Sequence, residues 1–162
     1  VRCLIMIYIF DLDHTVIDSS HRQLTRPDVA LDLQNWIENC TLEKIMADKL
    51  LPLARLMRSA YNQGHTVLIC TARNLSIFDY MFLGDNDLFA NAILSRPDGD
   101  NRPDDELKRD LLLKHFEGVP LARWARNAVF YDDNLAVLAM AEKLGIRTKN
   151  AIQLNAKMGA KA

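Results

Sequence analysis

The junction at the end of the first apolar run constrains the fold more than any other feature of the sequence. Residues 4–10 (LIMIYIF) are apolar throughout and lead directly into Asp11-Leu12-Asp13. A run that is apolar at every position is typical of a strand buried on both faces, as in a parallel sheet covered by helices. Further runs lie at residues 66–70 and 128–131, with weaker candidates at 92–94 and 146–154. We therefore expect a mostly parallel sheet of five strands.

Helical patterns separate these runs. Apolar spacing predicts a helix over residues 50–60 that stops before Gly64. Acidic residues at 104–106 open a second helix that continues to Gly118, and Asn134 caps a third that ends at Gly145. Alternating strands and helices predict an α/β fold with right-handed crossovers, a Rossmann-like three-layer sandwich. We expect residues 1–154 to form one domain and the basic tail over residues 155–162 to fray.

Composition limits the class of protein. A chain of 162 residues has room for one domain with one core. A net charge of −1 disfavours a protein that coats nucleic acid, and three cysteines without a CxxC motif disfavour a disulfide framework or a zinc site. The longest apolar run is too short to span a bilayer and no signal-peptide cleavage site follows it, so we expect a soluble, cytoplasmic protein.

Aspartates follow two of the apolar runs. Asp11 and Asp13 leave the first run, and Asp132 and Asp133 follow the run at residues 128–131. In open α/β sheets, ligands bind beyond the carboxyl ends of the strands. Adjacent buried carboxylates repel each other unless a cation is present, and their hard oxygen atoms suit Mg²⁺. An Asp-rich turn is the alternative for the first pair, but its position directly after a buried strand favours a functional site.

A hydroxyl and a guanidinium follow the run at residues 66–70. These groups belong to Thr71 and Arg73. Arg presents a planar fork of donors that matches phosphate oxygens. The pair alone is a weak signal, but three strand ends together carry the parts of one phosphate site.

These parts, in this order, resemble the motifs of the haloacid dehalogenase-like phosphohydrolases. Asp11, Asp13 and Thr15 are similar to the first motif, Thr71 to the second, and Asp132-Asp133 to the fourth. The third motif needs a Lys near a helix start, for which Lys108 and Lys114 are the candidates, with Lys108 preferred. His14 departs from the pattern, since many members carry Gly there.

The resemblance implies a mechanism, a cofactor and a minimal cap. Asp11 would attack the phosphorus to give an aspartyl-phosphate, and Asp13 would protonate the leaving group and then deprotonate water. Thr71 and Lys108 would bind the phosphate oxygens. Mg²⁺ would be held by Asp11, Asp132, Asp133 and the backbone carbonyl of Asp13. Too few residues lie between the motifs for a large cap domain, and a strand and the lysine helix account for those between Thr71 and Asp132.

The stretch SRPDGDNRPDDELKRDLL looks like part of the 3′-phosphatase domain of phage-type polynucleotide kinase/phosphatases. That resemblance implies roles for Asp104, four residues before Lys108, and for Arg22 and Arg73 in binding the substrate phosphate; we count Thr15 with these substrate-binding residues. No GxxxxGK[ST] motif is present, so the resemblance implies the phosphatase half without the kinase half.

We expect a Mg²⁺-dependent phosphomonoesterase that removes the 3′-phosphate from polynucleotide ends. An open site favours such a protruding substrate, and a local basic bias could attract a polyanion. The basic residues concerned are Arg22, Arg26, Arg73, Arg96, Arg102, Lys108 and Arg109. The alternatives are a 5′(3′)-nucleotidase or small-molecule phosphatase of the same fold, and a catalytically inactive phosphate- or protein-binding module.

Overall fold

The computed structural model describes residues 4–23 and 32–160 and contains one five-stranded parallel sheet. The strand order is β5-β4-β1-β6-β7, and each neighbouring pair is parallel. The strands are β1 (Ile7–Phe10), β4 (Thr66–Thr71), β5 (Ala92–Ser95), β6 (Ala128–Asp132) and β7 (Arg147–Asn150). The predicted α/β fold is confirmed, with β1 at the centre of the sheet.

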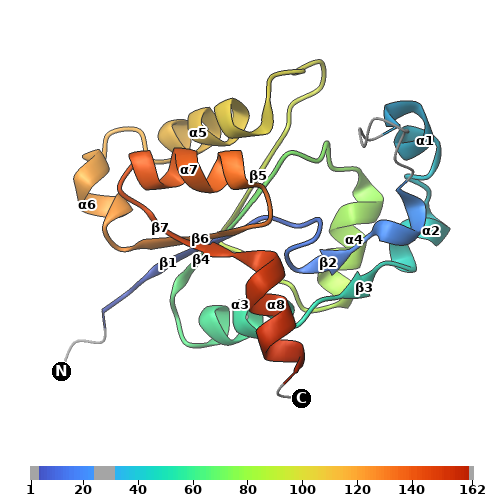
Figure 1. Ribbon diagram of the computed structural model, residues 1–162, viewed down its shortest axis with the longest axis horizontal. Coiled ribbons are helices and arrows are strands. Elements are labelled where there is room, and N and C mark those ends of the chain that lie inside the picture. The colour runs from blue at the N-terminus through green and yellow to red at the C-terminus, as the bar shows by residue number, and fades with distance from the viewer. Residues whose placement is uncertain (1–3, 24–31, 161–162) are drawn as a thin grey trace.

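Helices cover both faces of the sheet, which explains the continuous apolar runs (Figure 1). One face carries α5 (Asp104–His115), α6 (Leu121–Ala125) and α7 (Leu135–Lys143), and the other carries α3 (Leu53–Asn62) and α8 (Ala151–Gly159). Successive strand residues point to opposite faces. Ile9 therefore packs in the core cluster of α5, α6 and α7, whereas its neighbour Phe10 packs in the cluster of α3 and α8.

A small insertion lies beyond the carboxyl ends of the central strands (Figure 1). It consists of β2 (Ile17–Asp18), the 3₁₀ turn η1 (Ser20–Arg22), α1 (Leu33–Glu38), α2 (Leu42–Met46) and β3 (Lys49–Leu50). Strands β2 and β3 form an antiparallel pair, and α2 packs against α4 (Ile77–Asp85). This insertion corresponds to the minimal cap predicted from the sequence.

Three local predictions differ from the structure. The first strand begins at Ile7 because Leu4 and Ile5 are exposed rather than covered. Helix α4 was not predicted; it begins with a capping box in which Ser76 and Asp79 satisfy backbone N–H groups.

None of the helices among residues 4–23 and 32–160 is long and apolar enough to cross a bilayer.

The third difference concerns the C-terminal region. The run at residues 146–154 was predicted as one strand, but β7 ends at Asn150, whose side chain caps α8 by accepting from the Gln153 N–H. The fraying expected from residue 155 onward is not observed up to Gly159. Helix α8 is held in place because the buried Asn155 amide accepts from Leu53 N and donates to the Thr15 carbonyl.

Candidate active site

A cleft of about 810 Å³ opens at the carboxyl ends of β1, β4 and β6. Its lining includes all but two of the site residues predicted from the sequence: Asp11, Asp13, Thr71, Arg73, Asp104, Lys108, Asp132 and Asp133. The exceptions are Thr15 and Arg22, which are buried behind the lining. The residues at the strand ends therefore lie together in one cleft.

Three carboxylates lie close together at the floor of the cleft, and two of them accept hydrogen bonds from one ammonium. Asp11 ends β1, and Asp132 and Asp133 lie at the end of the neighbouring β6; one oxygen of each lies within 4.8 Å of the others. The Lys108 Nζ donates to Asp11 Oδ1 at 2.9 Å and to Asp132 Oδ2 at 2.7 Å. We call Asp11, Lys108, Asp132 and Asp133 the lysine cluster. Of the two candidate lysines, Lys108 is buried in this cluster, whereas Lys114 is exposed.

The lysine cluster carries more negative than positive charge, and the pKa values reflect this. Burial, together with the Asp132 charge, raises the pKa of Asp11 to about 7 although Lys108 opposes the shift. Burial also raises the pKa values of Asp132 and Asp133. The pKa of Lys108 lies above its usual value because Asp11 and Asp132 outweigh the effect of burial. Three hard carboxylates with a single buried ammonium are a donor set that suits a divalent cation such as Mg²⁺.

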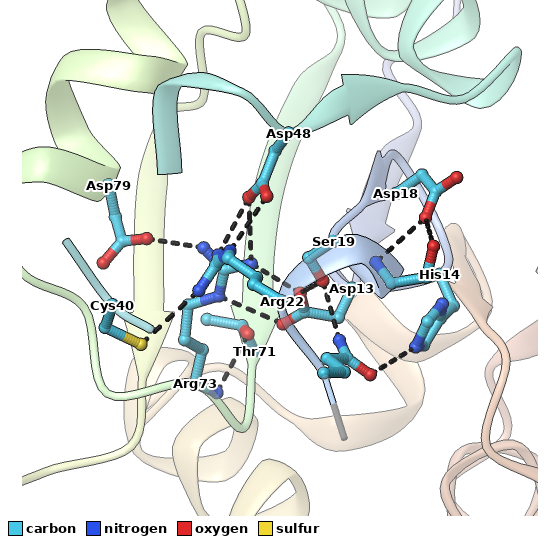
Figure 2. A network of polar contacts seen from close by, with 12 residues as sticks. Asp13, His14, Asp18, Ser19, Arg22, Cys40, Asp48, Thr71, Arg73 and Asp79 are labelled. Atoms are coloured by element: carbon cyan, nitrogen blue, oxygen red, sulfur yellow. Dashed lines mark hydrogen bonds and ion pairs between the residues drawn. The ribbon is translucent and has the colours of Figure 1, made fainter. Parts of the chain in front are cut away.

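The Asp13 carboxylate points toward the Arg73 guanidinium (Figure 2). The Arg73 Nε donates to Asp13 Oδ2 at 3.0 Å and Nη2 donates to Oδ1, which also accepts from the Ser19 hydroxyl. The remaining Arg73 nitrogen, Nη1, donates to Asp79 of α4. Burial disfavours an ionised Asp13, but Arg73 outweighs burial and holds the pKa of Asp13 below its usual value.

A second arginine is buried next to the first. The Arg22 Nε and Nη2 donate to the two carboxylate oxygens of Asp48 at 2.9 and 2.8 Å, and both side chains are fully buried. Figure 2 shows these groups as one assembly. The guanidinium carbons of Arg22 and Arg73 lie 4.4 and 5.4 Å from the centroid of the Trp36 ring. We call Asp13, Arg22, Asp48, Arg73 and Asp79 the arginine network.

The remaining predicted residues have distinct surroundings. Thr71 lies at the cleft floor, where its hydroxyl accepts from the Arg73 N–H at 3.0 Å. Thr15 is buried, and its hydroxyl has no hydrogen-bond partner among the described residues. Asp104 accepts from Arg96 at 2.7 Å. His14 adopts a positive φ of 59°, a conformation that suits glycine, which explains why this position can carry Gly in the resembling family.

Sequence reasoning missed Asp48, Asp79 and Trp36. No sequence motif marks Asp48, because it meets its partner Arg22 only when the insertion folds. Asp79 stands three residues after Ser76, a capping-box spacing that could have indicated the start of α4. Trp36 lies half-buried on the cleft wall, and no motif in the sequence marks it.

The basic residues expected to attract a polyanion are paired with carboxylates. Arg26 lies outside the described residues. The other pairs are Arg22–Asp48, Arg73–Asp13 and Arg73–Asp79, Arg96–Asp104, Arg102–Asp100 and Arg102–Asp110, Lys108–Asp11 and Lys108–Asp132, and Arg109–Asp110. Each of these positive charges therefore has a negative neighbour, which weakens the local basic bias predicted from the sequence.

Sequence comparison finds a phage enzyme along nearly the whole chain. The family model described as bacteriophage T5 5′-deoxynucleotidase matches residues 2–161. The 5′-deoxynucleotidase of Escherichia phage T5 is 32% identical over 174 residues, which cover 92% of this chain and 68% of that protein. A 5′-deoxynucleotidase is a phosphoric monoester hydrolase, which confirms the enzyme class predicted from the sequence.

Structural comparison finds the predicted superfamily fold. A chain of a Pnkp1/Rnl/Hen1 complex matches with a TM-score of 0.66 at 21% identity, over 90% of this chain and 45% of that chain. A haloacid dehalogenase-like hydrolase from Streptococcus pneumoniae matches with a TM-score of 0.60 at 15% identity, over 89% of this chain and 83% of that one. The chain thus spans less than half the length of the Pnkp1-complex chain, and the shared feature is the fold.

Proposed function

Because the chain belongs to the bacteriophage T5 5′-deoxynucleotidase family, we propose that it hydrolyses deoxynucleoside 5′-monophosphates in a Mg²⁺-dependent reaction. The observation that carries this proposal is the lysine cluster, in which Asp11 is the one carboxylate at the end of the central strand β1. Its partners from β6 and α5 surround it at the floor of an open cleft. This arrangement supports a nucleophilic carboxylate facing a phosphate group.

The residues that would hold Mg²⁺ are Asp11, Asp132 and Asp133. Their oxygens are close enough to share an ion, and burial, together with the neighbouring carboxylates, raises their pKa values. The backbone carbonyl of Asp13, implied as a further ligand by the family resemblance, stays a proposal. When bound, the ion would screen the repulsion between an attacking carboxylate and a phosphate dianion.

The chain's own residues account for the two chemical steps. In the first step, an oxygen of Asp11 forms a bond to phosphorus while the bond from phosphorus to the 5′-oxygen breaks. Asp13 gives that oxygen a proton, and because Arg73 favours the ionised form of Asp13 in the free protein, Asp13 must take up this proton before the step begins. In the second step, Asp13 takes a proton from water, whose oxygen attacks phosphorus and releases Asp11 and inorganic phosphate. Lys108 and Thr71, both at the cleft floor, would bind the phosphate oxygens throughout.

The arginine network supports this assignment of roles. Arg73 fixes the Asp13 carboxylate at the cleft wall through two donors. Arg73 also lines the cleft, which supports the role in binding a substrate phosphate that the family resemblance implies. Arg22 has its donors on Asp48 and is buried behind the lining, so we assign it a positioning role through Trp36 and Asp48 rather than a direct contact with phosphate.

Removal of a 3′-phosphate from polynucleotide ends is the second candidate. It is favoured by Arg102, whose side chain is 43% exposed at the cleft and could contact a neighbouring backbone phosphate. The pairing of the surrounding basic residues with carboxylates weighs against a long polyanion and supports a mononucleotide. We therefore rank the mononucleotide first.

A substrate comparison tests the proposal. Phosphate release is measured from 5′-dAMP, 3′-dAMP and a 3′-phosphorylated oligodeoxynucleotide, each with Mg²⁺ and with EDTA. We expect Mg²⁺-dependent release that is fastest from 5′-dAMP and is lost in EDTA. Faster turnover of the oligonucleotide would establish the second candidate in its place. Absence of release from all three substrates would instead support a binding module that has lost turnover.

A further inference from the structure

The cleft wall opposite the turn at residues 96–102 is an apolar face of helix α1. Leu33, Trp36 and Ile37 lie at the helical spacings that share one face, and Cys40 follows one turn later. All four side chains line the cleft. Leu33 and Ile37 are 62% and 59% exposed, and no residue of α1 is fully buried. The helix therefore presents an apolar surface to the cleft that the described protein core does not cover.

Trp36 holds this face in a fixed position relative to the reacting groups. The guanidinium carbons of Arg22 and Arg73 stack over its ring at 4.4 and 5.4 Å. Arg73 in turn contacts Asp13, which belongs to the proposed reaction centre. The apolar face and the phosphate-binding floor are thus parts of one cleft connected through a buried network.

The opposite wall is a turn that is internally braced. Arg96 donates to the carbonyls of Ala72, Asp100 and Arg102 at 2.8, 2.9 and 2.8 Å, and to the Asp104 carboxylate. Pro97, Gly99 and Asn101 of this turn also line the cleft. A flat group that enters between the two walls would meet apolar surface on the α1 side and polar groups on the turn side.

We propose that the α1 face (Leu33, Trp36, Ile37 and Cys40) is the nucleobase-binding wall of the substrate cleft. This inference rests on the proposed nucleotidase function, because the base enters with a phosphate bound at the lysine cluster. A nucleobase has two flat apolar faces and a polar edge, which matches one apolar wall and one polar wall. Apolar contact does not distinguish the hydrogen-bonding edges of the bases, so the α1 face itself favours no base over another.

The test compares a nucleotide with the same phosphomonoester lacking a base. The measured quantity is kcat/KM for 5′-dAMP divided by kcat/KM for 2-deoxyribose 5-phosphate. We expect Ile37→Ala to lower this ratio about 10-fold, the size of effect that loss of an apolar contact has in a binding pocket. Ile37→Leu keeps the ratio near the wild-type value, because it restores apolar contact. The four deoxynucleotides differ from one another by less than about 10-fold in the wild type.

Ile152→Ala is the matched control. Ile152 is 58% exposed on α8 and does not line the cleft. The ratio of the two kcat/KM values in Ile152→Ala therefore stays at the wild-type value. Because Ile37 is itself exposed, its replacement opens no core cavity, and a thermal melt verifies folding. An unchanged ratio in Ile37→Ala, or a wild-type protein that turns over both substrates equally, overturns the nucleobase wall while leaving the nucleotidase intact. No release from either substrate in the wild type overturns the proposed function itself.

Discussion

Two buried charge clusters meet at Asp11 and Asp13, which are two residues apart and have different partners. The lysine cluster has three carboxylates around one ammonium. The arginine network has three carboxylates around two guanidiniums, and the His21 ring also contacts Asp48. The pKa of Asp11 is raised by burial, whereas Arg73 lowers the pKa of Asp13 against the same effect. The two neighbouring aspartates therefore experience opposite electrostatic environments.

The difference indicates different tasks. In the arginine network, the charges and hydrogen-bond donors are close to balanced, which is what a buried structural ion-pair assembly requires. The lysine cluster is under-compensated, and such a site is suited to bind a cation or to exchange charge with a ligand. We infer that the lysine cluster is built for chemistry, whereas the arginine network is built to hold Asp13, Trp36 and the insertion in place.

The largest effect is expected from Asp11→Asn, which removes the proposed nucleophile without changing side-chain size. Phosphate release from 5′-dAMP should fall by at least ~10³-fold, because the aspartyl-phosphate can no longer form. The exposed Asp85→Asn on α4 is the matched control and should keep wild-type activity. A variant at residue 11 that retains a tenth of the wild-type rate would remove the nucleophile assignment.

Substitutions in the arginine network should lower the free energy of unfolding of the protein. Asp48→Asn leaves the fully buried Arg22 guanidinium without its charge partner, and we expect the free energy of unfolding to fall by about 3–5 kcal/mol. Urea unfolding measures this loss. The double variant Arg22→Met/Asp48→Leu removes both charges and should recover much of the stability. If the double variant is as unstable as the single one, the pair is not a balanced structural unit and the comparison fails.

The proximity of the carboxylates in the lysine cluster could be predicted because each strand end is marked by residues that are adjacent in the sequence. Each strand is marked by its own apolar run, and parallel strands bring their carboxyl ends to one edge, so Asp11 and Asp132 could be placed together without knowledge of the loops. The choice of Lys108 over Lys114 followed from the family resemblance, and Lys108 is the one of the two that contacts Asp11 in the structure.

The arginine network could not be predicted in the same way. Arg22 and Asp48 are separated by most of the insertion, and their pairing depends on how η1 and β3 meet in space. The family resemblance implied that Arg22 contacts the substrate phosphate, whereas the structure buries Arg22 in an ion pair with Asp48. β7 illustrates a related limit, because its short and partly exposed sequence RTKN lacks an apolar pattern and its end merges with the start of α8.

The smallest expected effect is a pH dependence that has opposite causes in the two clusters. In metal-free protein, Asp11 ionises near pH 7 when folded but near its ordinary value of 3.8 when unfolded. Folded protein thus holds this proton more tightly, and the stability of the wild type falls as pH rises from 5 to 8. Asp11→Asn has no carboxyl group to titrate at this position. The free energy of unfolding of the variant should therefore rise relative to that of the wild type by on the order of 2 kcal/mol across that interval.

Asp13 provides the internal contrast for the same measurement. Its lowered pKa means that it is ionised in both states above its ordinary value of 3.8, and its pairing with Arg73 stabilises the fold throughout the interval from pH 5 to 8. Asp13→Asn should therefore be less stable than the wild type by an amount that stays constant from pH 5 to 8. Urea unfolding in EDTA at several pH values measures both differences. Parallel pH dependence in the two variants would mean that the two aspartates share one electrostatic environment, contrary to the comparison that separates them.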